Sequence, residues 1–199
     1  MRWWMRMRLP VVQVWQAAYD KPYFFAGAGK GADVAAWRQA ARAEMARACK
    51  NVSFVALLLD MVKCFERVSH VWLARKAHDH DYPLRILRLC IQAYRLFRTI
   101  VVDGWCSRWL RASRGITAGA VHATVELRLL MLDALSRAAA IENVSTSAFV
   151  DDVTFDSVGP GPVARRAVLA ATRIFVGDMR ELEMEFSDTK NQCCLLYTS

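Results

Sequence analysis

The chain has 199 residues, which allows one large domain or two small ones. Hydrophobic residues make up 55% of the sequence and charged residues 23%, which excludes wholesale disorder and permits a buried core. The net charge of +8 at pH 7 favours a polyanionic partner such as a nucleic acid, although a basic surface that only aids solubility is an alternative. No apolar run approaches the length of a membrane span and we find no secretory signal, so we expect an intracellular protein with no membrane partner, in the nucleus or the cytoplasm.

The first third of the chain changes pattern twice. Residues 1–31 are dense in aromatic residues and irregular in pattern, so we expect an irregular N-terminal segment, and we interpret the glycine-rich stretch at its end, residues 27–31, as a flexible connection. A helix is predicted from an N-cap at Asp33 to about Lys50. Residues 54–59 then form a continuous apolar run, which is typical of a strand buried on both faces, and Asp60 follows it directly.

The middle of the chain is mainly helical in pattern. We predict helices over residues 70–80, 83–98 and 120–139, and a loop or short hairpin over 99–114 with its turn at Gly104. A last helix over 163–179 should be followed by a short alternating strand over 183–186 and a turn over 187–190. Arginines line one side of the predicted helix 83–98, which fits either a nucleic-acid contact or a solvated face. The six cysteines have irregular spacings with no paired C-x-x-C zinc pattern, so we expect free thiols in a reducing compartment.

Two adjacent acids interrupt an apolar stretch near residue 150. Strand-forming residues precede and follow Asp151 and Asp152, which predicts a β-hairpin with two carboxylates at its tip. Neighbouring carboxylates raise each other's pKa, and a divalent cation between them would offset this repulsion. The alternative is a solvated Asp-Asp turn with no ligand.

Asp60 and the hairpin acids each stand next to an apolar strand. If these strands are neighbours in one sheet, Asp60, Asp151 and Asp152 meet at one edge of it. Three carboxylates there could hold two metal ions about 4 Å apart, the arrangement that supports in-line nucleotidyl transfer.

At this point the sequence resembles the fingers and palm of a reverse transcriptase, of the non-long-terminal-repeat retrotransposon or group II intron type. The resemblance spans about residues 26–193 and is carried by four segments in the family's order: Leu59-Asp60-Met61-Val62-Lys63-Cys64-Phe65-Glu66-Arg67-Val68, Gly115-Ile116-Thr117-Ala118-Gly119, Phe149-Val150-Asp151-Asp152 and Phe186-Ser187-Asp188-Thr189-Lys190. It implies an α+β fold with an antiparallel sheet packed on helices, the palm of a right-hand polymerase. We expect a fingers and palm domain over residues 32–193, with partial fingers and no thumb.

The resemblance also implies an activity and its partners. The protein would be an RNA-directed DNA polymerase that uses an RNA template, a DNA primer and deoxynucleoside triphosphates. It would transfer nucleotides to the primer 3′-hydroxyl by two-metal catalysis, and it would be a truncated fragment of a larger retroelement polyprotein.

The resemblance assigns roles to six residues. Asp60 and Asp151 would bind the catalytic Mg²⁺ ions, with Mn²⁺ as an alternative metal, and Asp152 would support them. Lys190 would position or protonate the leaving pyrophosphate, unless it is a plain surface lysine. In the nucleotide site, Phe65 would act as a steric gate against a 2′-hydroxyl, unless it is a core residue. Gly119 would let the backbone approach the nucleotide or template.

Several positions depart from the family pattern. Ala118 stands where a glutamine is usual, Ala123 and Thr124 replace a usual Ser-Pro, and Glu66 replaces an aspartate. These departures keep open a second hypothesis, a catalytically inactive remnant that only binds nucleic acid. An RNA-directed RNA polymerase is a third, against which the bulky Phe65 argues.

The end of the chain has its own interpretation. Residues 194–199 resemble the translation of a sequencing adapter, so we expect a non-native tail after Cys193; an ordinary short strand is the alternative.

Overall fold

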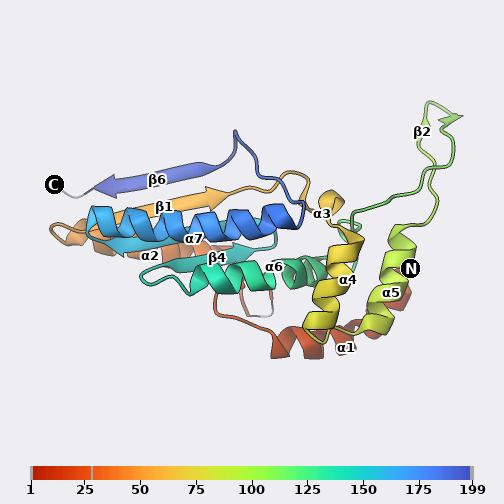
Figure 1. The fold of residues 1–199 in the computed structure, drawn as a ribbon, viewed down its shortest axis with the longest axis horizontal. Coiled ribbons are helices and arrows are strands. Elements are labelled where there is room, and N and C mark those ends of the chain that lie inside the picture. Colours follow the sequence, from red (N-terminus) through yellow and green to blue (C-terminus); the bar gives the residue numbers. More distant parts are fainter. Residues whose placement is uncertain (1, 28, 198–199) are drawn as a thin grey trace. The chain divides into compact units, whose positions relative to one another are not determined.

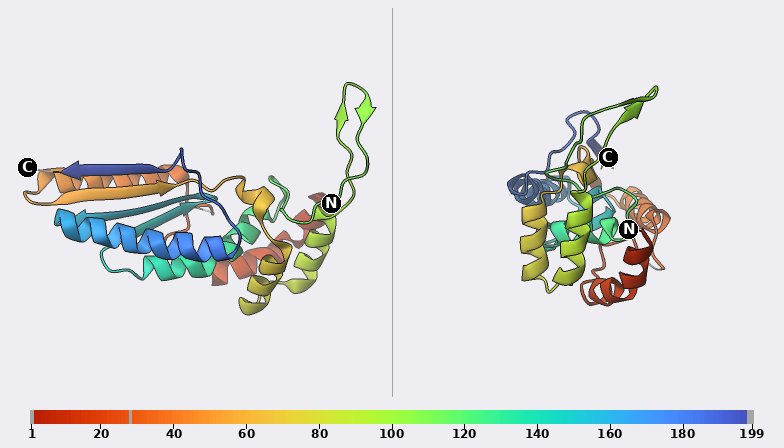
Figure 2. Two further views of the ribbon diagram at one scale, coloured as in Figure 1. Left: turned by 45° about the horizontal axis from the view of Figure 1, so that its top comes forward. Right: turned by 90° about the vertical axis from the view of Figure 1, so that its right-hand side faces the viewer.

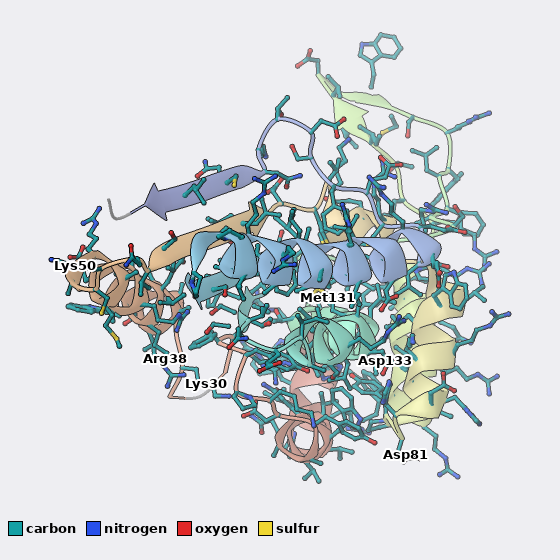
Figure 3. The ribbon with its side chains drawn as sticks, turned by 60° about the vertical axis from the view of Figure 1, so that its left-hand side comes forward. Lys30, Arg38, Lys50, Asp81, Met131 and Asp133 are labelled. Atoms are coloured by element: carbon teal, nitrogen blue, oxygen red, sulfur yellow. The ribbon has the colours of Figure 1, made fainter. Side chains whose placement is uncertain are left out.

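The computed structural model describes residues 2–27 and 29–197 (Figure 1). The contacts within the chain divide it into two compact units. Met1–Tyr19 and Lys63–Leu130 form one, which we call the helical unit, and Asp20–Val62 and Met131–Ser199 form the other, the sheet unit. Helix α6 (Ala123–Ala139) belongs to both and enters the sheet unit at Met131, which is labelled in Figure 3. The two units are described separately below.

The sheet unit is built on four antiparallel strands. They are β1 (Ser53–Leu59), β4 (Ser145–Phe149), β5 (Asp152–Gly159) and β6 (Gln192–Tyr197), in the order β4-β5-β1-β6. Strand β1 is central, and most of its residues are buried, as its continuous apolar run predicts. The predicted α+β fold with an antiparallel sheet packed on helices is therefore confirmed.

Helices cover both faces of this sheet (Figure 2). On one face Phe155 of β5 contacts Phe175 of α7 (Gly161–Glu181), with 5.7 Å between ring centroids. On the other, Phe54 and Ala56 of β1 form a buried cluster with Ala46 of α2 (Ala32–Ala48). Because successive strand residues point to opposite faces, α7 and α2 pack on opposite sides of the sheet.

The segment before α2 is ordered by the edge of the sheet. Ala148 of the edge strand β4 accepts a hydrogen bond from the Phe25 amide (2.9 Å) and donates one to the Tyr23 carbonyl (2.8 Å). Next to this contact, the Arg38 guanidinium of α2 lies 5.4 Å from the centroid of the Phe25 ring (Arg38 is labelled in Figure 3). Residues 23–25 of the predicted irregular segment are therefore ordered, and they pair backbone groups of the edge strand that would otherwise be unpaired.

The helical unit contains α1 (Arg2–Ala18), α3 (Cys64–Arg67), α4 (His70–Asp79), α5 (Leu84–Tyr94) and the first half of α6. Strands β2 (Val101–Val102) and β3 (Trp105–Cys106) form the hairpin expected around Gly104. Helix α1 contradicts the irregular segment predicted for residues 1–31. Met5, Val12 and Trp15 are buried at helical spacing, and the Trp15 indole donates a 2.6 Å hydrogen bond to the His80 carbonyl.

Two expectations near the C-terminus have different outcomes. An alternating strand predicted at residues 183–186 is wrong, because there only Phe186 pairs, in an isolated bridge with Met61. Residues 194–197 of the expected adapter-derived tail lie in β6, while Thr198 and Ser199 are outside the described residues. The origin of this tail stays a prediction.

Among the described residues, none of the helices is both long enough and apolar enough to cross a membrane.

Candidate active site

The register of the sheet brings the acidic residues to one end of it. Leu59, the last residue of β1, pairs with Val153 of β5, so continuing the antiparallel register by one residue places Asp60 opposite Asp152. In the neighbouring pair, Phe149 lies opposite Asp152, which leaves Val150 and Asp151 as a two-residue hairpin turn. The predicted hairpin is confirmed, but its tip carries only Asp151, because Asp152 is the first residue of β5. Asp60, Asp151 and Asp152 therefore meet at the same end of the sheet, as the sequence predicts.

Asp60 and Asp152 also share a face of the sheet. Directly opposed residues in an antiparallel pair point to the same side, and side chains alternate along each strand. This places both acids on the face that α2 covers further along the strands. Burial raises the pKa of Asp152, and the negative charges of Asp151 and Asp60 raise it further. Asp152 is thus close enough to both other carboxylates to be repelled by them.

The hairpin turn holds its backbone in a sparsely populated conformation. Val150 has φ 59°, in the left-handed region that a β-branched residue rarely adopts. A positive φ at the first of two central turn residues is the type II′ pattern, which favours glycine. The fold thus tolerates local strain of about 1–3 kcal/mol beside Asp151, and such strain is commonest at functional sites.

Backbone hydrogen bonds fix Asp60 against the segment that carries Lys190. The Asp60 amide donates to Asn191 Oδ1 (2.9 Å), and its carbonyl accepts from the Ser187 amide (2.9 Å). Ser187 Oγ in turn accepts from the Lys190 amide (3.1 Å), which closes the predicted turn over residues 187–190. Lys190 Nζ lies 3.8 Å from Asp60 Oδ2, so this mostly exposed lysine stands beside the acids as proposed.

A pocket opens between the acids and the first turns of α2. It has a volume of about 410 Å³, within the range of small-molecule sites. Asp60, Asp152 and Lys190 line it together with polar side chains from α2 and the strands: Gln39, Ser147, Thr154 and Gln192. The acidic end of the sheet therefore faces a cavity that is lined by the ammonium group of Lys190 and by several hydrogen-bonding side chains.

The other two predicted site residues belong to the helical unit. Phe65 of α3 is half-buried, and its carbonyl accepts a 2.8 Å hydrogen bond from the Ile116 amide. Gly115 donates to the Val68 carbonyl (2.8 Å), has φ 92°, and leaves no room for a side chain, since a Cβ would lie 2.8 Å from the Glu66 carbonyl oxygen. The first and second motif segments thus pair directly within this unit.

Gly119 lies at the rim of a separate cavity of the helical unit. It has φ 77° with open space around it, and it lines a pocket of about 480 Å³ with Thr117, Ala118 and Ala120. An exposed backbone at this position agrees with the predicted close approach of a ligand. The sequence pattern does not mark Asn191, whose side chain anchors the Asp60 amide, because a lone asparagine carries no distinguishing signal.

Comparisons with known proteins agree with this architecture. No protein-family model and no curated protein matches the chain. Among solved structures, the apo telomerase of Candida tropicalis truncated from its C-terminal domain has a TM-score of 0.72 at 12% identity, covering 98% of this chain and 41% of that one. The telomerase of Candida albicans in complex with a fragment of telomeric RNA has a TM-score of 0.65 at 13% identity, covering 100% and 36%.

These likenesses define the class of fold. The chain has a reverse-transcriptase-like fold, shared with telomerase, and it spans about two fifths or less of the length of those structures. At 11–13% identity the likeness concerns the fold alone, so function has to be argued from the site.

Proposed function

We propose that this protein is the palm and part of the fingers of an RNA-directed DNA polymerase. The observation that carries the proposal is the meeting of Asp60, Asp151 and Asp152 at one end of the sheet, beside Lys190 and a pocket. Such a cluster is costly without a ligand, because its members repel one another, and a strained turn holds one of them in place. The reverse-transcriptase-like fold supports the same reading.

The donor set fits Mg²⁺. The three acids offer only hard oxygen ligands, they are partly open to solvent, and their mutual repulsion would be relieved by a divalent cation. Asp60 and Asp151 are the proposed ligands, with Asp152 beside them, and Mn²⁺ could replace Mg²⁺. When bound, the metal would polarise phosphoryl oxygens and neutralise their charge.

The protein's own groups position the reacting atoms. In the proposed reaction the primer 3′-hydroxyl gives its proton to a water molecule, and its oxygen bonds to the α-phosphorus of a deoxynucleoside triphosphate. The bond from that phosphorus to the bridging oxygen breaks, and pyrophosphate leaves. Lys190, on a turn fixed by Ser187, would place an ammonium group near the leaving pyrophosphate and could return a proton to it.

The finer assignments rest on the motif segments and on the telomerase structures. The first-motif and second-motif segments favour a retroelement enzyme of the non-long-terminal-repeat or group II intron type. An RNA template is supported by the related fold of telomerase structures solved with a fragment of telomeric RNA. Phe65 would select deoxynucleotides and Gly119 would admit the nucleotide or template.

An inactive remnant is the second candidate, and one observation favours it. Ala118, where the family has a glutamine, is exposed in the pocket of the helical unit, so a side chain able to hydrogen-bond a nucleotide is missing from that wall. A remnant would bind primer and template with an affinity that falls steeply with salt, because neutralised phosphates release counterions. It would not extend the primer.

Primer extension separates the two candidates. The chain, alone and fused to a reverse-transcriptase thumb, is assayed with a primed RNA template, labelled deoxynucleotides and Mg²⁺. We expect Asp151→Asn to lower incorporation at least about 100-fold, because Asn cannot supply the negative charge that holds the metal. Asp188→Asn removes the same charge from an exposed turn nearby and should leave incorporation unchanged. Salt-sensitive binding without extension by the wild type would favour the remnant, and equal extension by wild type and Asp151→Asn would remove the catalytic assignment.

A further inference from the structure

The helical unit contains a buried group of three side chains that the proposed polymerase chemistry does not use. Cys90 lies on α5, His122 immediately precedes α6, and Glu126 lies four residues later in the first turn of that helix. All three residues are essentially inaccessible to solvent. One potential ligand atom from each, the cysteine sulfur, an imidazole nitrogen and a carboxylate oxygen, lies within 4.8 Å of the other two.

The hydrogen bonds of His122 leave one ring nitrogen directed at the cysteine. Its Nε2 is 3.0 Å from the Met5 carbonyl oxygen of α1, which can only accept, so Nε2 carries the proton. Nδ1 therefore presents a lone pair, 3.6 Å from Cys90 Sγ. Metal-binding histidines are commonly held in this way, with the second ring N–H donated to a backbone carbonyl.

Glu126 is arranged in the same manner. Its Oε2 accepts a 2.8 Å hydrogen bond from the Tyr94 hydroxyl. Its Oε1 is buried and makes no hydrogen bond of good geometry among the described residues, although the Cys90 thiol is close enough to interact with the carboxylate. The buried hydroxyl of Tyr82 also has no hydrogen-bond partner there. A buried carboxylate oxygen without a partner is unusual, since leaving it unpaired costs about 1–3 kcal/mol or more.

We propose that Cys90, His122 and Glu126 bind a Zn²⁺ ion in the helical unit. With Zn–S near 2.3 Å and Zn–N near 2.0 Å, the sulfur and nitrogen ligands of a tetrahedral site lie about 3.5 Å apart. The Sγ to Nδ1 distance of 3.6 Å already matches that spacing. The thiolate and carboxylate would neutralise the ion, and the sulfur ligand favours zinc over Mg²⁺. The fourth position would hold a water molecule.

The site would join three segments distant in sequence. The ligands come from α5 and α6, and the groups that orient them are Met5 of α1 and Tyr94 of α5. Met5 and Tyr94 also line the pocket of about 480 Å³ in this unit, so the proposed site lies next to a pocket through which an ion could enter. The proposal is independent of the polymerase assignment, because none of these residues belongs to the acidic end of the sheet.

Metal content and Co²⁺ spectroscopy on the full chain test the proposal. The protein purified with zinc should retain about one zinc per chain after desalting. Co²⁺ added to the metal-free protein should give the strong visible bands of tetrahedral cobalt and a thiolate-to-cobalt band in the near ultraviolet. Cys90→Ala should lose the thiolate band, and Glu126→Gln should weaken Co²⁺ and Zn²⁺ binding at least about 10-fold. Cys64→Ala, at another buried cysteine of the same unit, is the matched control and should bind as the wild type does.

Thermal unfolding gives a second readout. Zn²⁺ should raise the unfolding midpoint of the wild type and of Cys64→Ala, and it should raise the midpoints of Cys90→Ala and Glu126→Gln by clearly less at the same Zn²⁺ concentration. The wild-type spectrum decides the matter even where a variant fails to fold. Absence of stoichiometric zinc together with no tetrahedral cobalt spectrum would overturn the proposal, as would a thiolate band that persists in Cys90→Ala.

Discussion

Two aspartates of strand β5 lie on the same face of one sheet and have opposite surroundings. Asp156 is fully buried, and Arg42 of α2 binds both of its carboxylate oxygens, at 2.6 Å and 2.7 Å. Asp152, four residues earlier, lies at the exposed end of the strand and faces the like charges of Asp151 and Asp60. One acid has a cation supplied by the protein, and the other is surrounded by acids.

The difference separates an acid that holds the fold from acids that are available to a ligand. A bidentate arginine satisfies both oxygens of Asp156, so that carboxylate serves to anchor α2 on the sheet. At the other end of β5, Asp152 is repelled by Asp151 and Asp60, although a single substitution could remove this repulsion. Such locally unfavourable arrangements are expected where function requires them.

The largest effect should come from breaking the Arg42 pair. Arg42→Ala leaves the carboxylate of Asp156 buried without its cation, and we expect a loss of about 3 kcal/mol in the free energy of unfolding at pH 7. Urea denaturation of both proteins measures it. The double variant Arg42→Ala with Asp156→Asn should recover part of the loss, because no buried charge is then left unpaired. A loss below about 0.5 kcal/mol would mean that the pair is a minor surface contact.

The same variant should make stability depend on pH in a defined direction. Burial raises the pKa of Asp156 above its ordinary 3.8, and the hydrogen bonds and charge of Arg42 oppose that rise. Without Arg42 the folded-state pKa rises further. A raised folded-state pKa gives stability that is complete below the unfolded pKa and is lost as pH increases. The destabilisation by Arg42→Ala should therefore be smallest near pH 3.8 and grow toward pH 7, and a difference that shrinks as pH rises would contradict this account.

The acidic end of the sheet could be predicted because its signals are local. An uninterrupted apolar run before Asp60, and strand formers around Asp151 and Asp152, define strands by pattern alone. The order of the motifs in the reverse-transcriptase resemblance then predicts that these strands are neighbours in the sheet, which local pattern cannot predict. The β1–β5 register confirms that these strands are neighbours.

The features that the sequence did not predict depend on contacts between residues that are distant in the chain. Helix α1 was missed because Pro10 and a dense set of aromatics obscure its helical spacing, whereas its order comes from contacts such as that of Trp15 with His80. The Arg42 pair joins residues from a helix and a strand far apart in the chain, and no local pattern marks either partner. The same holds for the cluster of Cys90 with His122 and Glu126.

Relief of the hairpin strain should have an intermediate effect. Val150→Gly removes the conformational free energy that a β-branched residue costs at φ 59°. This gain exceeds the free energy lost because glycine makes the unfolded chain more flexible. We expect the free energy of unfolding to rise by about 0.5–1 kcal/mol. Incorporation should fall at the same time, because the turn no longer fixes Asp151. Greater stability with undiminished incorporation would show that the strain has no part in the reaction.

The smallest effect on stability, and the most direct test of the comparison, is expected for Asp152→Asn. In wild type the raised pKa of Asp152 means that its ionised form opposes folding, so the neutral amide should raise stability without metal. Solvent screening limits the gain to a few tenths of a kcal/mol. Mg²⁺ should then stabilise the wild type more than the variant, since the variant offers one carboxylate fewer. Thermal melting with and without Mg²⁺ measures both quantities, with Asp188→Asn as the control for lost charge. If Asp152→Asn instead destabilises the protein as much as Arg42→Ala does, the two acids of β5 have the same structural role. That result would contradict the proposal that the acidic end of the sheet binds a metal ion.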